Sequence, residues 1–406
     1  MNPPESALSR AARWLTFGSA ASILFSIAVS QTLLALAFAA LLASGEKLRL
    51  PRIKWPLALF MLGTLVSLAF SGDPAVYGLP QVRKFYVFLE LLVVFSCLRN
   101  LKVVRWLFLT WAGIGAITAL RGCVQFAGKV EEAHRLGRSF YDYYVVERIT
   151  GFTSHWNTYS AEEMFALIMV AALLMFAPRA RRNWIWALCG ILIAAAVVLG
   201  ETRGIWIATA AAAVYLVVFW RPWLLALIPV AIALVYLAAP AEMRERITSI
   251  VRPSSVDSNQ FRKIAWSAGL AMIERHPLLG IGPDGPKFHF KEYVPADVWR
   301  TRPPGFYEHL HNVYLQLAAD RGIPTMLAML WMLIQMPIDF WRGLRELPPG
   351  PSVRRFLLHG AVAVVLAVMV EGFVEYNLGD SEVLAMFLVA TACGYLALEK
   401  DVAPLQ

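Results

Sequence analysis

The chain has 406 residues, of which 58% are hydrophobic and only 16% are charged, and its formal net charge is +9. A water-soluble domain is nearer half apolar and a quarter charged, so much of this apolar surface must face the lipid bilayer instead of water. The 14 Trp, 23 Phe and 13 Tyr exclude a disordered chain, and the dispersed basic residues fit membrane topology better than a nucleic-acid-binding face.

Apolar stretches of about the length needed to cross hydrocarbon predict twelve transmembrane helices in an all-α polytopic fold. Their approximate ranges are 13–29, 30–45, 56–71, 85–99, 106–126, 158–177, 184–200, 204–220, 223–239, 325–341, 356–374 and 382–398. The first two share one apolar run, and we place the turn between them near Ser30 and Gln31. The run lacks a convincing small-residue cleavage site, so we expect a retained first helix instead of a cleaved signal peptide.

Lys and Arg in short connections prefer the cytoplasm and therefore predict the orientation. With the N-terminus inside, every connection after an even-numbered helix is basic. These connections contain Lys47, Arg49, Arg52, Lys54, Arg99, Lys102, Arg105, Arg179, Arg181, Arg182, Arg221, Arg342, Arg345, Arg354 and Arg355. An even number of helices returns the C-terminus to the cytoplasm, and the two longest connections then lie on the outer face.

These two outer segments, about 127–157 and 240–324, divide the chain into three parts. Residues 1–239 hold helices one to nine with the first outer segment, residues 240–324 form the second, and residues 325–406 hold the last three helices and a cytoplasmic tail. The second is too long for a connector, so we expect it to fold over the outer mouth of the helices. Six of the seven histidines fall in the two outer segments, which concentrates the side chains suited to acid–base chemistry on one face.

Three short sequences on this face carry polar side chains suited to chemistry. The first, 148–157, leads into the sixth helix, and the second, 201–204, is a hinge with almost no loop between the seventh and eighth helices. The third, 308–316, leads towards the tenth helix, and Arg262 lies upstream of it.

Arg148, Arg203 and Arg262 are the candidate ligands for a diphosphate. By residue type alone, Arg203 is more often an interfacial anchor or a partner of Glu201, and Arg148 a solvated loop charge. Here, however, several arginines and a histidine pair are predicted on one face. This favours a functional interpretation, because together they can hold a diphosphate and accept a proton.

His309 and His311 would share a face only if the segment between them is extended. We expect His309 to be a structural histidine bonded to backbone, and His311 to be functional, with Asn312 fixing it at the mouth of the helices. Metal binding needs more than two ligands, and no Asp-x-Asp or His-Glu-x-x-His pattern accompanies the pair. The four cysteines lie in apolar runs at no metal-type spacing. We therefore expect no metal, no cofactor and no disulfide.

The order of these motifs resembles the O-antigen ligase and polymerase superfamily. The resemblance rests on 148–157, on Thr202-Arg203-Gly204, on the block from Arg262 to Gly282, and on His311-Asn312 ahead of 320–322. These motifs cover about residues 145–325, and the hydropathy layout extends the likeness to the whole chain. The length, the single large outer segment before the last three helices and the His-x-His-Asn form are most similar to the ligase that attaches O-antigen to the lipid A core.

The resemblance implies a GT-C-like enzyme of the bacterial inner membrane, with a periplasmic active site and cytoplasmic termini. Its activity would be an inverting, metal-independent transfer of O-antigen polysaccharide from undecaprenyl diphosphate to a sugar hydroxyl of lipid A core. His311 would then be the base, and Arg203, with Arg148 and Arg262, would bind the diphosphate and stabilise the leaving group. His309, Asn312 and Asn157 would support them, and the partners would be lipid and glycan, without nucleic acid.

Two kinds of alternative stay open. The superfamily's motifs separate ligases poorly from O-antigen polymerases and protein O-oligosaccharyltransferases. From another class, a polytopic transporter or flippase would use intramembrane carboxylates such as Glu90 and Glu371, although either could pair with a nearby arginine. The chain shows no convincing internal repeat, and transport leaves residues 240–324 without a clear task.

Overall fold

The computed structural model describes residues 6–72, 78–227, 259–302 and 307–402, together with a few single residues between these ranges. Its regular elements are all helices, and η marks a 3₁₀ helix. In chain order they are α1 (Ala7–Ser22), α2 (Ile27–Ala43), α3 (Lys54–Ala69), α4 (Leu79–Arg83), η2 (Lys84–Phe88), α5 (Leu89–Cys97), α6 (Leu101–Arg135), α7 (Phe140–Tyr144), α8 (Trp156–Phe176), α9 (Asn183–Leu199), α10 (Arg203–Trp220), η3 (Pro222–Leu227), α13 (Asn259–Arg275), α14 (Gly285–His289), η4 (Phe290–Tyr293), α15 (Ala296–Thr301), α16 (Val313–Arg321), α17 (Ile323–Glu346), α18 (Val353–Glu371), η5 (Asn377–Gly379) and α19 (Ser381–Leu398).

Six of the described helices, α6, α8, α10, α17, α18 and α19, are long and apolar enough to cross a membrane. Three more apolar helices, α2, α3 and α9, are shorter. Eleven of the twelve predicted spans coincide with a helical segment, whereas the ninth, 223–239, is described only in part. The structure thus confirms an all-helical protein with several candidate membrane spans, and the number twelve stays a prediction.

The turn between the first two helices lies earlier than the sequence suggested. The chain turns at 23–26 instead of near Ser30 and Gln31, and the side chain of Ser26 caps α2 by accepting a hydrogen bond from the backbone of Val29. Ser30 is instead buried inside α2, where its carbonyl accepts a hydrogen bond from Ser19 at 2.8 Å. The prediction was wrong because a polar pair inside an apolar run resembles a turn, whereas here Ser30 forms an interhelical contact.

Helix α6 is much longer than the predicted span of 106–126. Its 35 residues reach Arg135 and correspond to about 50 Å, well beyond the roughly 30 Å of hydrocarbon. Many of the additional residues are polar but good helix formers, so the helix continues after the hydrophobic stretch ends. Near its outer part, Gln125 accepts hydrogen bonds from the backbone of Thr150 and Gly151 at 3.1 and 2.9 Å. The extended helix therefore supports the loop that carries Arg148.

Several carboxylates are buried among the helices. Glu90 accepts a hydrogen bond from Ser19 at 2.6 Å, and Glu371 accepts one from the amide of Asn377 at 3.1 Å. These partners are a hydroxyl and an amide instead of the arginine considered from the sequence. Glu162 and Glu163 of α8 are also buried, a feature that hydropathy did not reveal.

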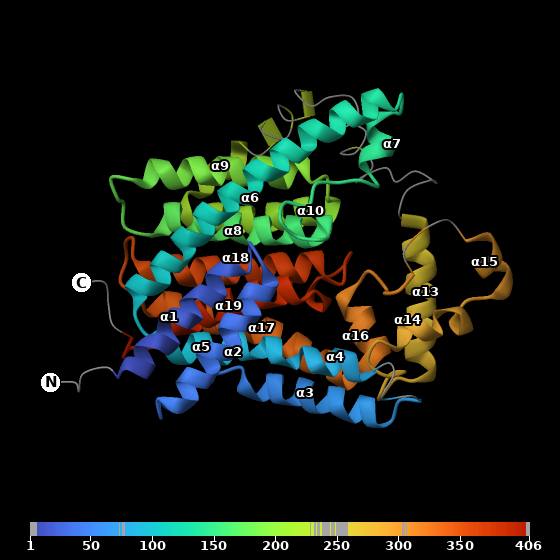
Figure 1. The fold of residues 1–406 in the computed structure, drawn as a ribbon, viewed down its shortest axis with the longest axis horizontal. Coiled ribbons are helices and arrows are strands. Elements are labelled where there is room, and N and C mark those ends of the chain that lie inside the picture. The colour runs from blue at the N-terminus through green and yellow to red at the C-terminus, as the bar shows by residue number, and fades with distance from the viewer. Residues whose placement is uncertain are drawn as a thin grey trace.

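The long helices run roughly side by side, and Figure 1 shows two different ends of the bundle. Both chain ends lie at one end, here called the terminal end, whereas α13 to α16 lie at the other, here called the loop end. Helices α8, α18 and α19 are the most buried of the candidate spans, so they form the centre of the bundle. At the loop end, α16 packs beside the end of α3, where Ser67 donates to the carbonyl of Asp320 at 3.0 Å.

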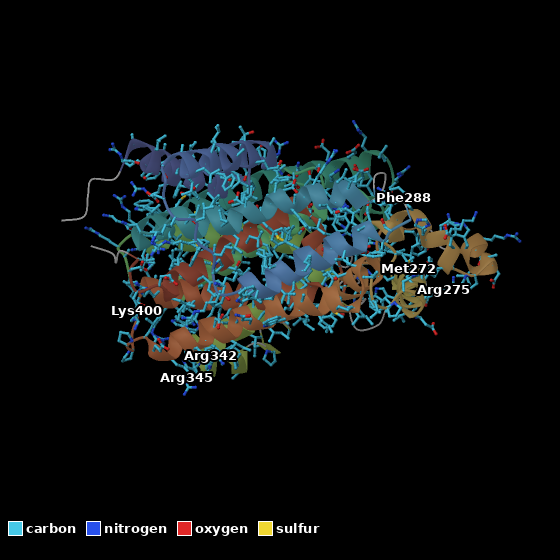
Figure 2. The ribbon with its side chains drawn as sticks, turned by 90° about the horizontal axis from the view of Figure 1, so that it is seen from below. Met272, Arg275, Phe288, Arg342, Arg345 and Lys400 are labelled. Atoms are coloured by element: carbon cyan, nitrogen blue, oxygen red, sulfur yellow. The ribbon has the colours of Figure 1, made fainter. Side chains whose placement is uncertain are left out.

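Basic residues predicted on one side of the membrane gather at the terminal end. Asp401 forms ion pairs with Arg49 and Arg99, which come from two different connections. Figure 2 places Arg342 and Arg345 at this same end, and Met272, Arg275 and Phe288 at the other. These two groups of labelled residues thus lie at opposite ends of the bundle, and the side of a membrane that each end faces stays a prediction.

This arrangement predicts opposite accessibility for two positions in a chain whose native cysteines are replaced. Arg275→Cys should react with a membrane-impermeant maleimide in intact cells, whereas Arg345→Cys should react only after permeabilisation, because a bilayer would separate them. Labelling followed by gel shift measures both. Reaction of both variants from the same side would contradict the arrangement.

Candidate functional site

The N-terminus of α16 is attached to the turn that follows α18. Asn312 caps α16 by accepting hydrogen bonds from the backbone of Tyr314 and Leu315 at 3.0 and 2.9 Å. Its side-chain amide donates to the carbonyl of Phe373 at 3.0 Å, and the backbone of Val313 donates to that of Gly372 at 2.8 Å. The cap that starts the helix thus also holds the residue before it, His311, against residues 371–375.

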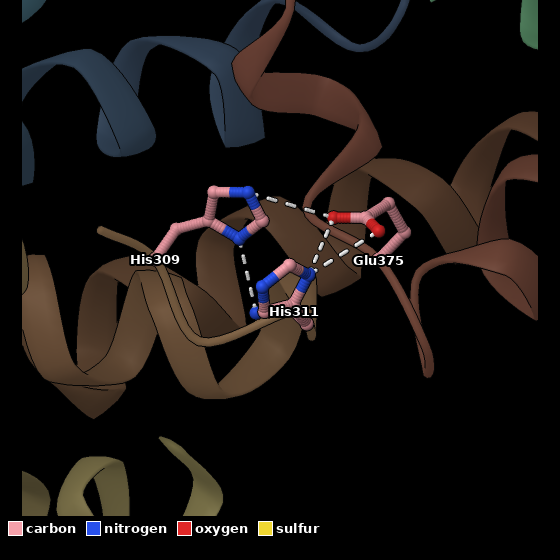
Figure 3. A group of neighbouring side chains, drawn as sticks. All are labelled: His309, His311 and Glu375. Atoms are coloured by element: carbon pink, nitrogen blue, oxygen red, sulfur yellow. Dashed lines mark hydrogen bonds and ion pairs between the residues drawn. The ribbon is translucent and has the colours of Figure 1, made fainter. Parts of the chain in front are cut away.

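His309, His311 and Glu375 meet at this junction (Figure 3). The Nδ1 atom of His311 lies 3.2 and 3.3 Å from the two carboxylate oxygens of Glu375, and Nε2 of His309 lies 3.7 Å from one of them. The two imidazole rings are 4.0 Å apart between centroids, while Leu310 between them is fully buried. Both imidazoles therefore share one face of their segment.

The backbone of His311 is unusual for a residue with a side chain. Its φ is +49°, in the left-handed region, and the other described non-glycine residues with positive φ are Glu201 and Asp284. Such conformations cost about 1–3 kcal/mol and persist where the surrounding structure imposes them. The hydrogen bonds of Asn312 and Val313 supply that constraint beside His311.

The hydrogen bonds define which imidazole nitrogens carry protons. The backbone N–H of His311 donates to Nδ1 of His309 at 3.1 Å, so in the neutral ring the proton of His309 is on Nε2. Since a carboxylate only accepts, Nδ1 of His311 must donate to Glu375. Nε2 of His311 is therefore the nitrogen without a proton when the ring is neutral.

The cluster also has a defined charge. Burial lowers the pKa of His309 to about 4, although the charge of Glu375 opposes this effect, so His309 is neutral at pH 7. Burial alone would raise the pKa of Glu375, but the hydrogen bond from His311, followed by nearby positive charge that includes Arg262, keeps it below its ordinary value. Glu375 is therefore an ionised carboxylate at neutral pH.

Helix α13 contributes two neighbouring side chains to the cluster. A terminal nitrogen of Arg262 lies 3.8 Å from Glu375, and the ring of Phe261 meets that of His311 edge to face at 5.0 Å between centroids. Arg262 was predicted as a diphosphate ligand, and the structure places it beside the carboxylate that binds His311.

The start of α10, which carries Arg203, lies beside the same junction. It is the first residue of α10, after the hinge at 200–202. A Cβ added to Gly204 would lie 2.9 Å from the side chain of Val374, which is the residue before Glu375. The turn after α18 therefore lies between the start of α10, with Arg203, and the start of α16, with His311.

Arg148 belongs to the hinge side of this arrangement. Its guanidinium lies 4.2 Å from the ring centroid of Trp156, the first residue of α8, and only 8% of its surface is exposed. Asn157 follows Trp156, and its backbone N–H donates to Nδ1 of His155, the residue that caps α8. Burial raises the pKa of Tyr144, with Glu201 and Arg148 exerting opposite electrostatic effects on the same hydroxyl. Arg148, Glu201 and the hinge before Arg203 are thus neighbours.

Glu375 is the residue of this site that the sequence analysis missed. It lies 64 positions from His311 and carries no local motif that links it to the histidines. The available signal was its position, because the predicted eleventh span ended at residue 374 on the same outer face. A carboxylate there was within reach of His311, but only the packing of the turn after α18 against the start of α16 identifies the partner.

The cluster also has the composition of a metal site. The potential ligand atoms of His309, His311 and Glu375 lie within 4.8 Å of one another, and two histidines with a glutamate can bind zinc. In the tautomers described above, however, both nitrogens that face Glu375 carry protons, and Arg262 adds a positive charge beside them. In this arrangement Glu375 accepts a hydrogen bond from His311, and the absence of a metal stays a prediction.

The lowered pKa of His309 predicts a pH-dependent stability. Unfolded His309 regains a pKa near 6.5, so the unfolded chain binds more protons than the folded one between about pH 6.5 and 4. The melting temperature of the purified protein should therefore fall as the pH decreases through this interval. His309→Gln should make that fall less steep, whereas the exposed control His134→Gln should leave it unchanged. Equal slopes for the protein and His309→Gln would contradict this assignment.

Comparison with protein-family models finds a match over part of the chain. The family model described as O-antigen ligase matches residues 188–330, from α9 into α17. No curated protein matches the chain. The matched part contains Arg203, Arg262 and both histidines of the cluster, whereas Arg148 and Glu375 lie outside it. This match supports membership of the chain in the O-antigen ligase and polymerase superfamily.

Proposed function

We propose that the chain is an inverting glycosyltransferase that moves O-antigen polysaccharide from undecaprenyl diphosphate to a sugar hydroxyl of lipid A core. The reaction would take place at the periplasmic face of the bacterial inner membrane. The observation that carries this proposal is the bond between His311 and Glu375, next to the start of α10 with Arg203 and at the loop end of the bundle. The family match over residues 188–330 supports the reaction class.

His311 acts as the general base in this mechanism. The acceptor hydroxyl gives its proton to Nε2 of His311 while its oxygen forms the new bond to the anomeric carbon. Glu375 holds Nδ1, which orients the ring and stabilises the imidazolium that forms, as the carboxylate does in a hydrolase triad. A base of this kind typically contributes about 10²- to 10⁴-fold to the rate.

The arginines act on the leaving group. As the bond between the anomeric carbon and the diphosphate breaks, its electron pair stays on the diphosphate oxygen, where the positive charges of Arg203 and Arg148 stabilise it. Attack from the face opposite the diphosphate inverts the anomeric centre without a covalent enzyme intermediate. Arg262 forms an ion pair with Glu375, 3.8 Å away, and its guanidinium also binds the diphosphate.

The mechanism is metal-independent, because arginines supply the positive charge that a divalent cation would otherwise supply. The protonated nitrogens that face Glu375 support this point, since a metal would have to displace those protons.

A reconstituted enzyme with purified donor and acceptor tests the mechanism. His311→Ala should lower kcat by about 10²- to 10⁴-fold, and Glu375→Gln should lower it by at least roughly tenfold, because the ring loses its orienting partner. His134→Ala and Glu292→Gln, which alter other residues of the outer segments, should retain the parental rate. The rate is measured by transfer of radiolabelled glycan in detergent, without a gradient and with a chelator present.

Three results of this assay would contradict different parts of the proposal. Parental activity of His311→Ala would remove the base assignment. Activity that depended on an added divalent cation would exclude the metal-independent mechanism, and activity that required a membrane gradient would favour a transporter.

The acceptor is tested by deleting the gene. Loss of a ligase should leave long glycan on the lipid carrier, because polymerisation continues without transfer. Loss of a polymerase should instead leave a single repeat unit on lipid A core. Gel electrophoresis of the lipopolysaccharide and of the carrier fraction measures the difference, and single-repeat lipopolysaccharide would contradict the proposed ligase.

A further inference from the structure

A pocket lies at the loop end of the structure. It has a volume of about 380 Å³ and is lined by residues of α14, η4 and α15 and by described residues between α15 and His309. Its walls include the aromatic rings of Phe288, Trp299 and Tyr307, and Phe288 is 44% exposed. This size is within the range of small-ligand sites, and flat aromatic rings offer the faces on which the apolar side of a pyranose packs.

The pocket is also positively charged. Its lining includes Lys287, Lys291, Arg302 and a single carboxylate, that of Glu308. Lys287 forms an ion pair with Glu308 at 2.6 Å, which leaves the charges of Lys291 and Arg302 for a ligand. The lining therefore favours an anionic saccharide.

Arg302 is held in place before any ligand binds. Its guanidinium lies 3.6 Å from the ring centroid of Trp299 and donates to the backbone carbonyl of the same residue at 2.6 Å. Stacking of a guanidinium on an indole fixes the plane of its remaining N–H donors. A fixed fork of donors suits phosphate or carboxylate groups better than a mobile surface charge does.

A chain of aromatic contacts connects this pocket with His311. The ring of Tyr307 meets that of Phe261 at 6.1 Å between centroids, and Phe261 meets His311 at 5.0 Å. The start of α10, with Arg203, approaches the same junction through Gly204 and Val374. The pocket is thus connected to the junction by Phe261, whereas the start of α10, with Arg203, contacts the junction at Val374.

We propose that this pocket binds the anionic core oligosaccharide of the acceptor and presents its hydroxyl to His311. The inference rests on the proposed function, in which Arg203 binds the diphosphate of the donor. Inversion requires the acceptor to attack the anomeric carbon from the face opposite that diphosphate. The pocket adjoins His311 through Phe261, whereas Arg203 adjoins the junction through a different contact, so an acceptor in the pocket would approach separately from the donor. The phosphate and acid groups of the acceptor bind Lys291 and Arg302, and its sugar rings pack on Trp299 and Phe288.

Steady-state kinetics of the full-length enzyme in detergent tests the pocket. Arg302→Gln, Lys291→Gln and Trp299→Ala should each raise KM for the acceptor by about three- to tenfold, while kcat and KM for the donor stay unchanged. Arg300→Gln is the matched control, because Arg300 is an exposed cation next to Trp299 that does not line the pocket. The two exposed polar substitutions keep the test valid if Trp299→Ala does not fold.

Phosphatase treatment of the acceptor separates charge from general damage. The treated acceptor should raise KM for the parental enzyme to the value of Arg302→Gln, and it should change the KM of Arg302→Gln much less. Unchanged acceptor KM in all three variants, an equal rise in Arg300→Gln, or a rise in donor KM instead would overturn the pocket assignment. Absence of transfer by the parental enzyme would instead overturn the proposed function.

Discussion

The hydrogen bond between His311 and Glu375 is the interaction on which the candidate site depends. It joins two segments that are 64 residues apart, and backbone contacts hold both sides of it. Asn312 caps α16 and binds the turn after α18 at once, so the same residue determines where the helix starts and where the imidazole lies. A buried carboxylate is costly without partners, and here an imidazole and Arg262 supply them.

The turn after α18 contacts the starts of two helices, α10 and α16. Small residues make this possible, because a Cβ at Gly204 or Gly372 would lie within 2.9 Å of the side chains of Val374 and Val313, respectively. The arginine at the start of α10 and the histidine before α16 therefore approach one turn from two helices. A substitution that moves this turn would displace both groups together, although neither would be changed in sequence.

Hydropathy and charge predicted much of the fold, whereas the site needed tertiary contacts. Apolar runs have a simple period and length, so most helices were located, and the basic connections indicated which ends lie together. Polar residues inside or beyond a run misled the analysis, as at Ser30 and in the outer part of α6, because packing and helix propensity decide these positions. His311 was recognised from its neighbours, but Glu375 was not, because its partner is distant in sequence.

The positions of His311 and Glu375 in the chain have a consequence for membrane insertion. The imidazole precedes α17, whereas its carboxylate follows α18, so a growing chain inserts the first long before the second. Until the turn after α18 packs against the start of α16, the ring lacks this hydrogen-bond acceptor. Under the proposed mechanism, the base would therefore be complete only after α18 has been inserted.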